Sequence, residues 1–265
     1  MSETLINKPP MDYEQLRDVI ELSLWTGQLL LQNGAEAQRV EDTVHHLGTG
    51  LGADWLDIFI SASTIAITTH SGTEFRTKIR RVVNLGVNMT VVSAVNNMSR
   101  QVTAGEYDRF RVRQELERIS KGLHHYNRWL IVAMVGVACG AFSQLLGAGW
   151  EIFIITFFSA STAMFTRQEL HKQHFNPYLI VLTTAFVGGL LGSSAALLQL
   201  PKAELALTAS VLLLVPGVPL VNAFEDMLKG YMVIGMARAT TGTQILLAIA
   251  LGLLLAISAT GVKGF

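Results

Sequence analysis

The chain has 265 residues, of which 50% are hydrophobic and 15% charged, and its mean hydropathy is +0.40. A soluble domain carries about 25% charged residues, so this composition argues against a purely soluble enzyme. The formal net charge of zero argues against a nucleic-acid-binding protein, and a single cysteine, Cys139, excludes a disulfide framework and a cysteine-based zinc site.

The charged residues are concentrated in the first half of the chain. Residues 1–128 contain 14 basic and 15 acidic residues, whereas residues 129–265 contain 6 and 5. This asymmetry predicts an α+β cytoplasmic domain over residues 1–125, followed by a transmembrane domain over residues 126–265. The first residues lack the apolar segment of a cleaved signal peptide, so none is expected.

Helical spacing of apolar residues predicts helices over Tyr13–Gln32 and Ala35–Leu47, with Asn33-Gly34 as the stop signal between them. Short β-branched and aromatic runs then predict three strands, over Trp55–Ser61, Ser63–His70 and Glu74–Val83. Two further helices are expected over Met89–Glu106 and Asp108–Lys121.

The third predicted strand carries Arg76, Lys78 and Arg80 at alternate positions, so these cations share one face. Such a row could hold a carboxylate or contact anionic lipid headgroups. The alternative is a solvated strand face without a ligand.

Long uncharged segments fill the second half. A helix needs about 20 apolar residues to cross the hydrocarbon core. The segments predict five transmembrane helices, over residues 129–146, 148–166, 178–200, 205–224 and 239–262.

Basic residues beside the predicted spans indicate the orientation, because cytoplasmic flanks carry an excess of Lys and Arg. A cytoplasmic first half places five basic residues inside and two, Lys202 and Lys263, outside. The five are Arg128, Arg167, Lys172, Lys229 and Arg238.

The fourth predicted span contains Pro216, Gly217 and Pro219, which should break the helix. Transporters use discontinuous helices to present freed backbone groups and half-helix ends to a substrate. Asn222, followed by Glu225, Asp226 and Lys229 at helical spacing, lies just beyond the break. A proline kink with a charged helix end is the competing interpretation.

The second predicted span carries Thr156, Ser159 and Thr162, whose hydroxyls either line a path or bond to carbonyls of their own helix. Pairs of glycines at four-residue spacing, Gly136 with Gly140 and Gly188 with Gly192, predict close helix packing.

The sequence contains no Ser-His-Asp arrangement, no P-loop and no HExxH motif. An enzyme is therefore not expected, nor a metal or a cofactor. A transporter is the favoured class, ahead of a membrane-tethered enzyme or a scaffold.

Several segments resemble the threonine/serine exporter family: LLLQNGAEAQRVED (Leu29–Asp42), SASTIAITT (Ser61–Thr69), GVNM (Gly86–Met89) and SVLLLVPGVPLVN (Ser210–Asn222). The chain length and WEIFIITFFSASTAMFTRQ (Trp150–Gln168) are similar to the larger subunit of a two-protein bacterial succinate exporter of this family. The resemblance implies a multi-pass protein of the bacterial inner membrane. It also implies that a small membrane subunit of the YjjB type supplies further spans, although a homodimer or higher oligomer could do so too.

The function expected from the resemblance is export of a small carboxylate, succinate first, with threonine or serine as the alternative. Lys229 and Arg238 would draw carboxylates, and Asp226 would carry a proton or hold an amine. The candidate substrate path comprises Pro216, Gly217, Pro219, Asn222, Asp226, Lys229, Arg238, Thr156, Ser159 and Thr162. In the cytoplasmic half, Gly34, Glu36, Arg76 and Asn88 are candidates for gating or folding.

Overall fold

The structure is a computed structural model that describes residues 11–83, 86–122 and 126–262. The chain forms two compact units. The first comprises Met1–His125 together with Val218–Ala239, and the second comprises Tyr126–Gly217 together with Thr240–Phe265. No local pattern in the sequence predicts that residues 218–239 pack with the first unit.

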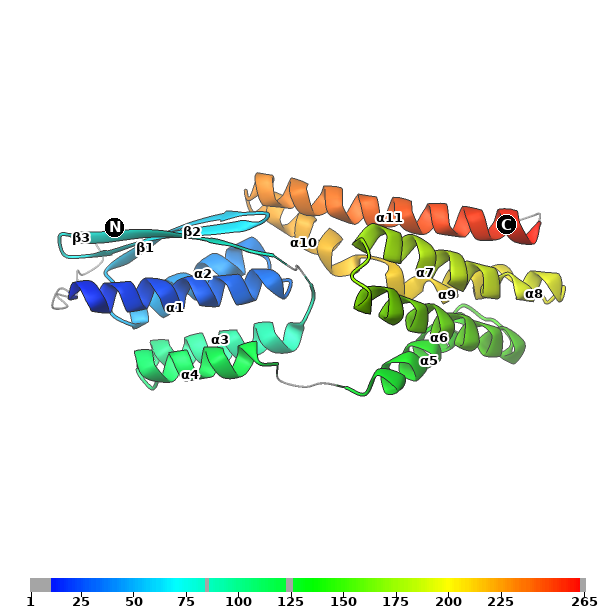
Figure 1. The fold of residues 1–265 in the computed structure, drawn as a ribbon, viewed down its shortest axis with the longest axis horizontal. Coiled ribbons are helices and arrows are strands. Elements are labelled where there is room, and N and C mark those ends of the chain that lie inside the picture. Colours follow the sequence, from blue (N-terminus) through cyan, green and yellow to red (C-terminus); the bar gives the residue numbers. More distant parts are fainter. Residues whose placement is uncertain (1–10, 84–85, 123–125, 263–265) are drawn as a thin grey trace. The chain divides into compact units, whose positions relative to one another are not determined.

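The first unit combines helices with a three-stranded antiparallel sheet of order β1-β2-β3 (Figure 1). Its elements are α1 (Tyr13–Gln32), α2 (Ala37–Gly50), β1 (Trp55–Ser61), β2 (Thr64–Ser71), β3 (Glu74–Arg81), α3 (Met89–Thr103) and α4 (Arg109–Ser120). The unit also includes most of α10 (Gly217–Leu228) and the start of α11 (Met232–Thr260). The helices and strands predicted over residues 13–121 are confirmed to within a few residues at their ends.

α1 is the central helix of this unit, and it packs against α2, α3, α4 and the sheet. Its apolar residues Leu16, Val19, Ile20 and Leu24 are almost completely buried, because they recur at helical spacing toward the core. Ile234 of α11 belongs to the same core, so apolar packing ties the start of α11 to the unit.

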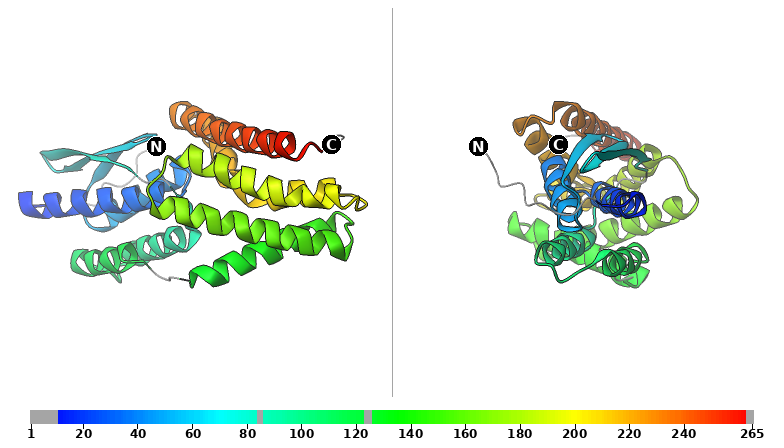
Figure 2. Two further views of the ribbon diagram at one scale, coloured as in Figure 1. Left: turned by 45° about the vertical axis from the view of Figure 1, so that its right-hand side comes forward. Right: turned by 90° about the vertical axis from the view of Figure 1, so that its left-hand side faces the viewer.

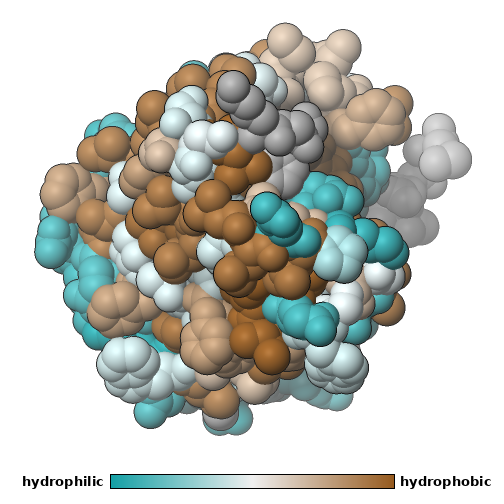
Figure 3. All heavy atoms as spheres, turned by 90° about the vertical axis from the view of Figure 1, so that its right-hand side faces the viewer, coloured by the Kyte–Doolittle hydropathy of each residue, from teal (hydrophilic) through white to brown (hydrophobic). Residues whose placement is uncertain are grey.

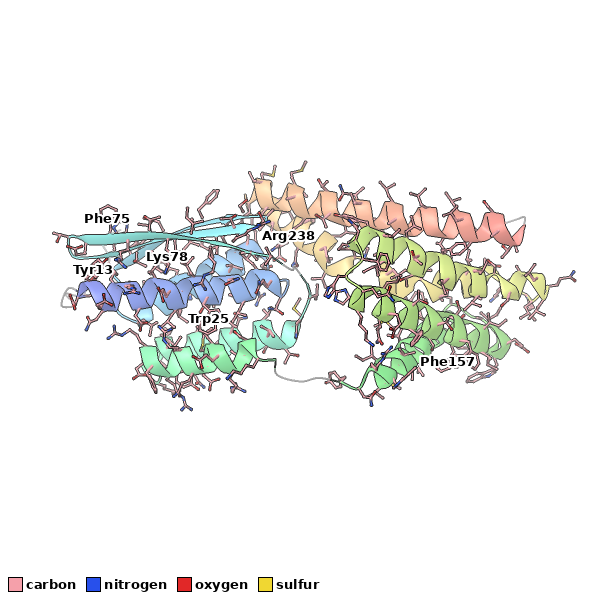
Figure 4. All side chains as sticks on the ribbon, viewed as in Figure 1. Tyr13, Trp25, Phe75, Lys78, Phe157 and Arg238 are labelled. Atoms are coloured by element: carbon pink, nitrogen blue, oxygen red, sulfur yellow. The ribbon has the colours of Figure 1, made fainter. Side chains whose placement is uncertain are left out.

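The basic row on β3 faces α1. The Lys78 ammonium lies 2.6 Å from the Glu21 carboxylate of α1, and the Arg76 guanidinium lies 3.8 Å from the centre of the Tyr13 ring. Arg80 donates to a glutamine of α1. Figure 4 shows Tyr13 and Lys78 between the helix and the sheet. α1 therefore contacts all three cations, and a carboxylate or lipid site on this row stays one of the two alternatives that the sequence leaves open.

The opposite face of the sheet carries exposed apolar side chains. Phe59, Phe75 and Ile79 are about two-thirds exposed. Cross-strand pairing of Phe59 with Ala66, and of Ala66 with Ile79, places Phe59 and Ile79 in one row, and Phe75 lies on the same face of β3 as Ile79. The alternation predicted for β3 is thus correct, but the apolar residues occupy the outer face.

The second unit is a bundle of helices. It contains α5 (Arg128–Leu145), α6 (Trp150–Lys172), α7 (Pro177–Gly192), α8 (Ser194–Leu197), α9 (Glu204–Ser210), the 3₁₀ turn η1 (Leu212–Leu214) and the remainder of α11. α6 packs against α5 and α7, and the views in Figures 1 and 2 show these helices side by side.

Glycines allow close approach of these helices, as the four-residue spacing predicts. A Cβ atom on Gly136 would lie 2.2 Å from the Ser161 hydroxyl and 2.8 Å from the Phe157 carbonyl oxygen of α6. A Cβ atom on Gly192 would lie 3.1 Å from the Ala206 carbonyl oxygen of α9. The helix backbones therefore approach too closely for a larger residue at Gly136.

Three helices are long and apolar enough to cross a membrane among residues 11–83, 86–122 and 126–262: Arg128–Leu145, Pro177–Leu197 and Met232–Thr260. A bent pair, Glu204–Leu214 with Gly217–Leu228, raises the number to four if it forms one span. α6 falls outside this set, because Glu151, Arg167 and its hydroxyl residues lower its apolarity. Five spans stay a prediction. Apolar residues cover much of the face in Figure 3.

Candidate functional site

The break predicted in the fourth apolar segment is present in the backbone. Val215, before Pro216, has φ −61° and ψ 122°, because a residue that precedes proline is pushed toward extended conformations. The helical axes on the two sides of the break differ by 62°. Pro219 lies in the first turn of α10, where an N–H group has no helical partner to lose, so Pro216 and not Pro219 marks the interruption that follows the 3₁₀ turn η1.

Beyond the break, side chains of α10 and α11 hold the loop between α1 and α2. The Asn222 amide donates to the Gly34 carbonyl oxygen at 2.7 Å. The Arg238 guanidinium donates to the Ala35 carbonyl oxygen at 2.7 Å. We call the loop of residues 33–36 together with Asn222, Asp226 and Arg238 the clasp. All its members belong to the first unit.

Asp226 completes the clasp by capping α2. Its carboxylate accepts a hydrogen bond of 2.8 Å from the Ala37 backbone N–H, in the first turn of that helix. Glu36, at the N-cap position, makes no capping bond with its own side chain. The carboxylate of another helix therefore fills the usual place of a capping residue, where the helix dipole also favours negative charge.

The Asp226 side chain is fully buried and forms an ion pair of 2.6 Å with Arg238. The Arg238 side chain is 16% exposed, and Figure 4 labels it at the start of α11. A buried carboxylate is strongly unfavourable without compensation. Arg238 and the Ala37 N–H together supply that compensation.

A second layer of charges surrounds the clasp at its exposed edge. Lys229 pairs with Glu225 of α10 and lies 3.4 Å from the Glu36 carboxylate. Burial raises the pKa of the Glu36 carboxyl, and the nearby Glu225 carboxylate raises it further. The hydrogen bond to Glu225 raises the pKa of Lys229, which keeps its ammonium charged.

Tyr231 anchors the turn between α10 and α11. Its hydroxyl donates to the Glu41 carboxylate of α2 at 2.6 Å. Burial raises the pKa of Tyr231 well above its usual value, and the hydrogen bond to Glu41 adds to the effect. The turn is thus held by apolar packing, by an ion pair and by this hydrogen bond.

The structure brings together six of the residues that the sequence nominates: Gly34, Glu36, Asn222, Asp226, Lys229 and Arg238. Sequence reasoning missed Tyr231, Glu41 and the backbone groups of Ala35 and Ala37. No local pattern marks them, because their partners lie about 190 residues away in the chain.

Two further candidates in the first unit have local structural contacts. Arg76 lies over the Tyr13 ring, away from the clasp residues. Asn88 caps α3, because its side chain accepts from the Thr90 and Val91 N–H groups. Its own backbone N–H donates to the Asn33 carbonyl oxygen at 3.0 Å, so Asn88 also fixes the loop of the clasp.

The hydroxyl candidates of α6 lie in the second unit and differ in their contacts. Ser159 is buried and donates to the Gly188 carbonyl oxygen of α7 at 2.6 Å. Thr162 bonds to the Phe158 carbonyl oxygen of its own helix. The Thr156 hydroxyl is buried and has no hydrogen-bond partner among the described residues.

Within the described part of the chain, no group of three or more His, Cys, Asp or Glu side chains is placed to hold a metal ion.

Comparison with known proteins gives matches over nearly the whole chain. Residues 21–260 match the family model ThrE, described as "Putative threonine/serine exporter". The chain is 37% identical to "Probable succinate transporter subunit YjjP" of Escherichia coli K12, over 96% of this chain and all of that protein. It is 26% identical to the "Threonine/serine exporter" of Corynebacterium glutamicum, over 86% of this chain but only 48% of that protein.

No solved structure matches the chain at a significant level. The family match covers both compact units, including the broken segment and the clasp residues from Gly34 to Arg238. This protein belongs to the threonine/serine exporter family.

Proposed function

We propose that this protein is one subunit of a bacterial inner-membrane exporter of small carboxylates, with succinate as the first substrate. The observation that carries the proposal is the 37% identity over the full length of a protein named as a succinate transporter subunit. The apolar helices of the second unit provide the membrane-spanning part that such a function needs.

A second chain is part of the proposal. The protein corresponds to about half of the C. glutamicum exporter, and the E. coli relative is named a subunit. A small membrane subunit of the YjjB type would supply the remaining helices. Loss of either subunit should abolish export to the same degree as loss of both.

The proposed orientation places residues 1–125, with residues 218–239 that pack against them, in the cytoplasm and the apolar helices of the second unit in the inner membrane. Reporter fusions after Lys172 and after Lys263 test this topology. The first should report a cytoplasmic site and the second an outer site. Lys263 lies outside the described residues. The same side for both fusions would contradict five spans.

We infer that the clasp is a gate at the cytoplasmic end of the pathway. The charges of Asp226 and Arg238 are satisfied within the protein, so either group can contact a substrate only after the clasp opens. The interruption at Pro216 offers a hinge, because backbone torsion there is not restrained by helical hydrogen bonds. Pro216, Gly217 and Pro219 are then hinge residues, and Asn222, Asp226, Lys229 and Arg238 are gate residues.

Charge provides a driving force for a dicarboxylate. Moving one elementary charge across 100 mV changes the free energy by about 2.3 kcal/mol. A dianion that leaves a cell with a negative interior gains roughly twice that, about 4.6 kcal/mol, without a coupling ion. A zwitterionic amino acid gains nothing from the potential and needs another driving force.

Export from vesicles decides the substrate. Vesicles that contain both subunits are loaded with labelled succinate or labelled threonine, and efflux is followed with the potential clamped. Succinate efflux that increases with an interior-negative potential supports the proposal. Threonine efflux without succinate efflux would establish the alternative, which the similarity to the C. glutamicum exporter favours.

A further inference from the structure

An open surface cavity of about 820 Å³, lined mostly by polar and charged residues, lies in the first unit between α2 and α3. Residues of α2 at helical spacing form one wall, and residues of α3 at helical spacing form the other. The cavity is lined by Glu36, Arg39, Asp42, Thr43, His46, Asn96, Ser99, Arg100, Thr103 and Lys229, with Gln38 and Ala104. Small-molecule sites in proteins commonly measure about 300–1,000 Å³.

The inner wall of the cavity is fixed by hydrogen bonds between the two helices. The Thr43 hydroxyl lies 3.2 Å from the Asn96 amide oxygen. The Ser99 hydroxyl donates to the Thr43 carbonyl oxygen at 3.2 Å and is buried. These hydrogen bonds fix α2 and α3 relative to each other, so the cavity between the two helices is formed before a ligand binds.

The two arginines at the cavity are incompletely paired. Among the described residues, Arg100 makes no ion pair or hydrogen bond through its side chain. Arg39 has one partner, the Glu36 carboxylate, at the long distance of 3.5 Å. A guanidinium presents a fork of donors that matches the two oxygens of a carboxylate. Asp42 also forms no ion pair with a described residue, and so leaves an acceptor for an ammonium group.

We propose that this cavity binds a small carboxylate from the cytoplasm, with Arg100 and Arg39 on the carboxylate oxygens. This inference rests on the proposed function and deepens it, since it places a site for the cargo before the membrane. A dicarboxylate would use both arginines. An α-amino acid would place its carboxylate on an arginine and its ammonium group on Asp42.

The cavity also shares residues with the surroundings of the clasp. Glu36 and Lys229 line it, and the same two residues form the charged layer beside Asp226. A carboxylate bound in the cavity competes with Glu36 for Arg39. Binding therefore changes the charges that surround the clasp, which links occupancy of the cavity to the gate.

The test is binding to the full chain in lipid nanodiscs, measured by calorimetry with succinate and, separately, with L-threonine. One of the two should bind saturably. The variant Arg100→Gln should weaken that binding by roughly tenfold or more, because a hydrogen bond between charged groups is lost. Arg81→Gln is the matched control, since Arg81 is exposed on β3 and does not line the cavity. It should bind as the wild type does.

Thermal unfolding without ligand separates binding from folding. The Arg100→Gln and Arg81→Gln variants should unfold at the temperature of the wild type. Absence of saturable binding for both ligands, or equal binding by Arg100→Gln and the wild type, would overturn the inference.

The inference and the proposed function fail in different ways. If vesicles export succinate but Arg100→Gln binds it normally, the cavity is not the site and the proposed function stands. If L-threonine binds through Arg100 and vesicles export threonine alone, the cavity is the site and the succinate assignment is wrong.

Discussion

Asp226 and Arg238 lie twelve residues apart, on α10 and α11, and their side chains form an ion pair of 2.6 Å within the first unit. Each also contacts the backbone at the start of α2, Asp226 at Ala37 and Arg238 at Ala35. The pair thus joins three elements. It connects the helix that follows the proline break to the loop that precedes α2.

Removing one member of this pair should destabilise the first unit strongly. The variant Arg238→Met leaves the buried Asp226 carboxylate without its partner, at a cost of about 3–5 kcal/mol. The double variant Asp226→Leu with Arg238→Met removes both charges. Apart from the hydrogen bond to the Ala35 carbonyl oxygen, which both variants lose, it should lose only the helix cap, about 0.5–2 kcal/mol. Thermal unfolding of the full chain in detergent provides the comparison.

The control for this experiment is Arg118→Gln. Arg118 pairs with Glu115 on the surface of α4, with its side chain 61% exposed, and such pairs contribute about 0–1 kcal/mol. A double variant that is less stable than Arg238→Met would contradict the account of Asp226 as a buried charge in need of a partner.

Replacing Gly34 with alanine should destabilise the protein more than the same replacement at Gly105, which has a similar backbone conformation. Gly34 and Gly105 have φ of 88° and 77°, where alanine costs about 1–2 kcal/mol. A Cβ atom on Gly34 would also lie 3.2 Å from the Gly86 carbonyl oxygen, whereas one on Gly105 meets no atom within 4 Å.

The difference in stability between the Gly34→Ala and Gly105→Ala variants measures the cost of the contact with the Gly86 carbonyl oxygen. We expect Gly34→Ala to be less stable by about a further 1 kcal/mol, the lower end of overpacking costs. Equal unfolding temperatures would show that the loop of the clasp adjusts without strain.

His45 should make the stability of the protein sensitive to mild acid. Burial lowers the pKa of His45 below its ordinary value of 6.5. The unfolded chain therefore binds a proton first as the pH falls. The contribution of His45 to the free energy of unfolding is complete above about pH 6.5. It is lost as the pH decreases through the pKa that His45 has in the folded protein.

The variant His45→Gln should reduce the decrease in unfolding temperature between about pH 7.5 and pH 5.5. His171→Gln, at an exposed position of α6 in the second unit, is the control and should retain the wild-type dependence. The prediction is wrong if the two variants show the same pH dependence.

Variants of the hydroxyl residues of α6 should distinguish a role in helix packing from a role in transport. Ser159→Ala removes a hydrogen bond between α6 and α7, which costs about 0.6 kcal/mol on average in a membrane protein. Thr156→Val removes a buried hydroxyl without a partner among the described residues, so stability should be unchanged or slightly higher.

Export distinguishes the two roles for Thr156. Reduced export by a stable Thr156→Val variant would support a place in the substrate path. Thr162→Ala is the control, because Thr162 bonds only to a carbonyl oxygen of its own helix. Normal export by Thr156→Val would remove Thr156 from the proposed path.

Local chemistry alone determined several features of this protein. The interruption at Pro216 follows from a residue that has no N–H group and restricts the residue before it. The apolar helices and the three strands follow from the spacing of their apolar residues. Close packing at Gly136 follows from the four-residue spacing of small side chains.

Only the tertiary structure decided which face each element presents and which distant residues meet. Alternation on β3 puts Arg76 and Lys78 on one face, but the position of α1 determines that these cations contact Tyr13 and Glu21. Likewise, the charges of Asp226 and Arg238 are visible in the sequence, whereas their contacts with the start of α2 are not. Those contacts join groups 189 and 203 residues apart, and no short-range pattern encodes a pairing that arises only when α10 and α11 pack against the core around α1 and α2.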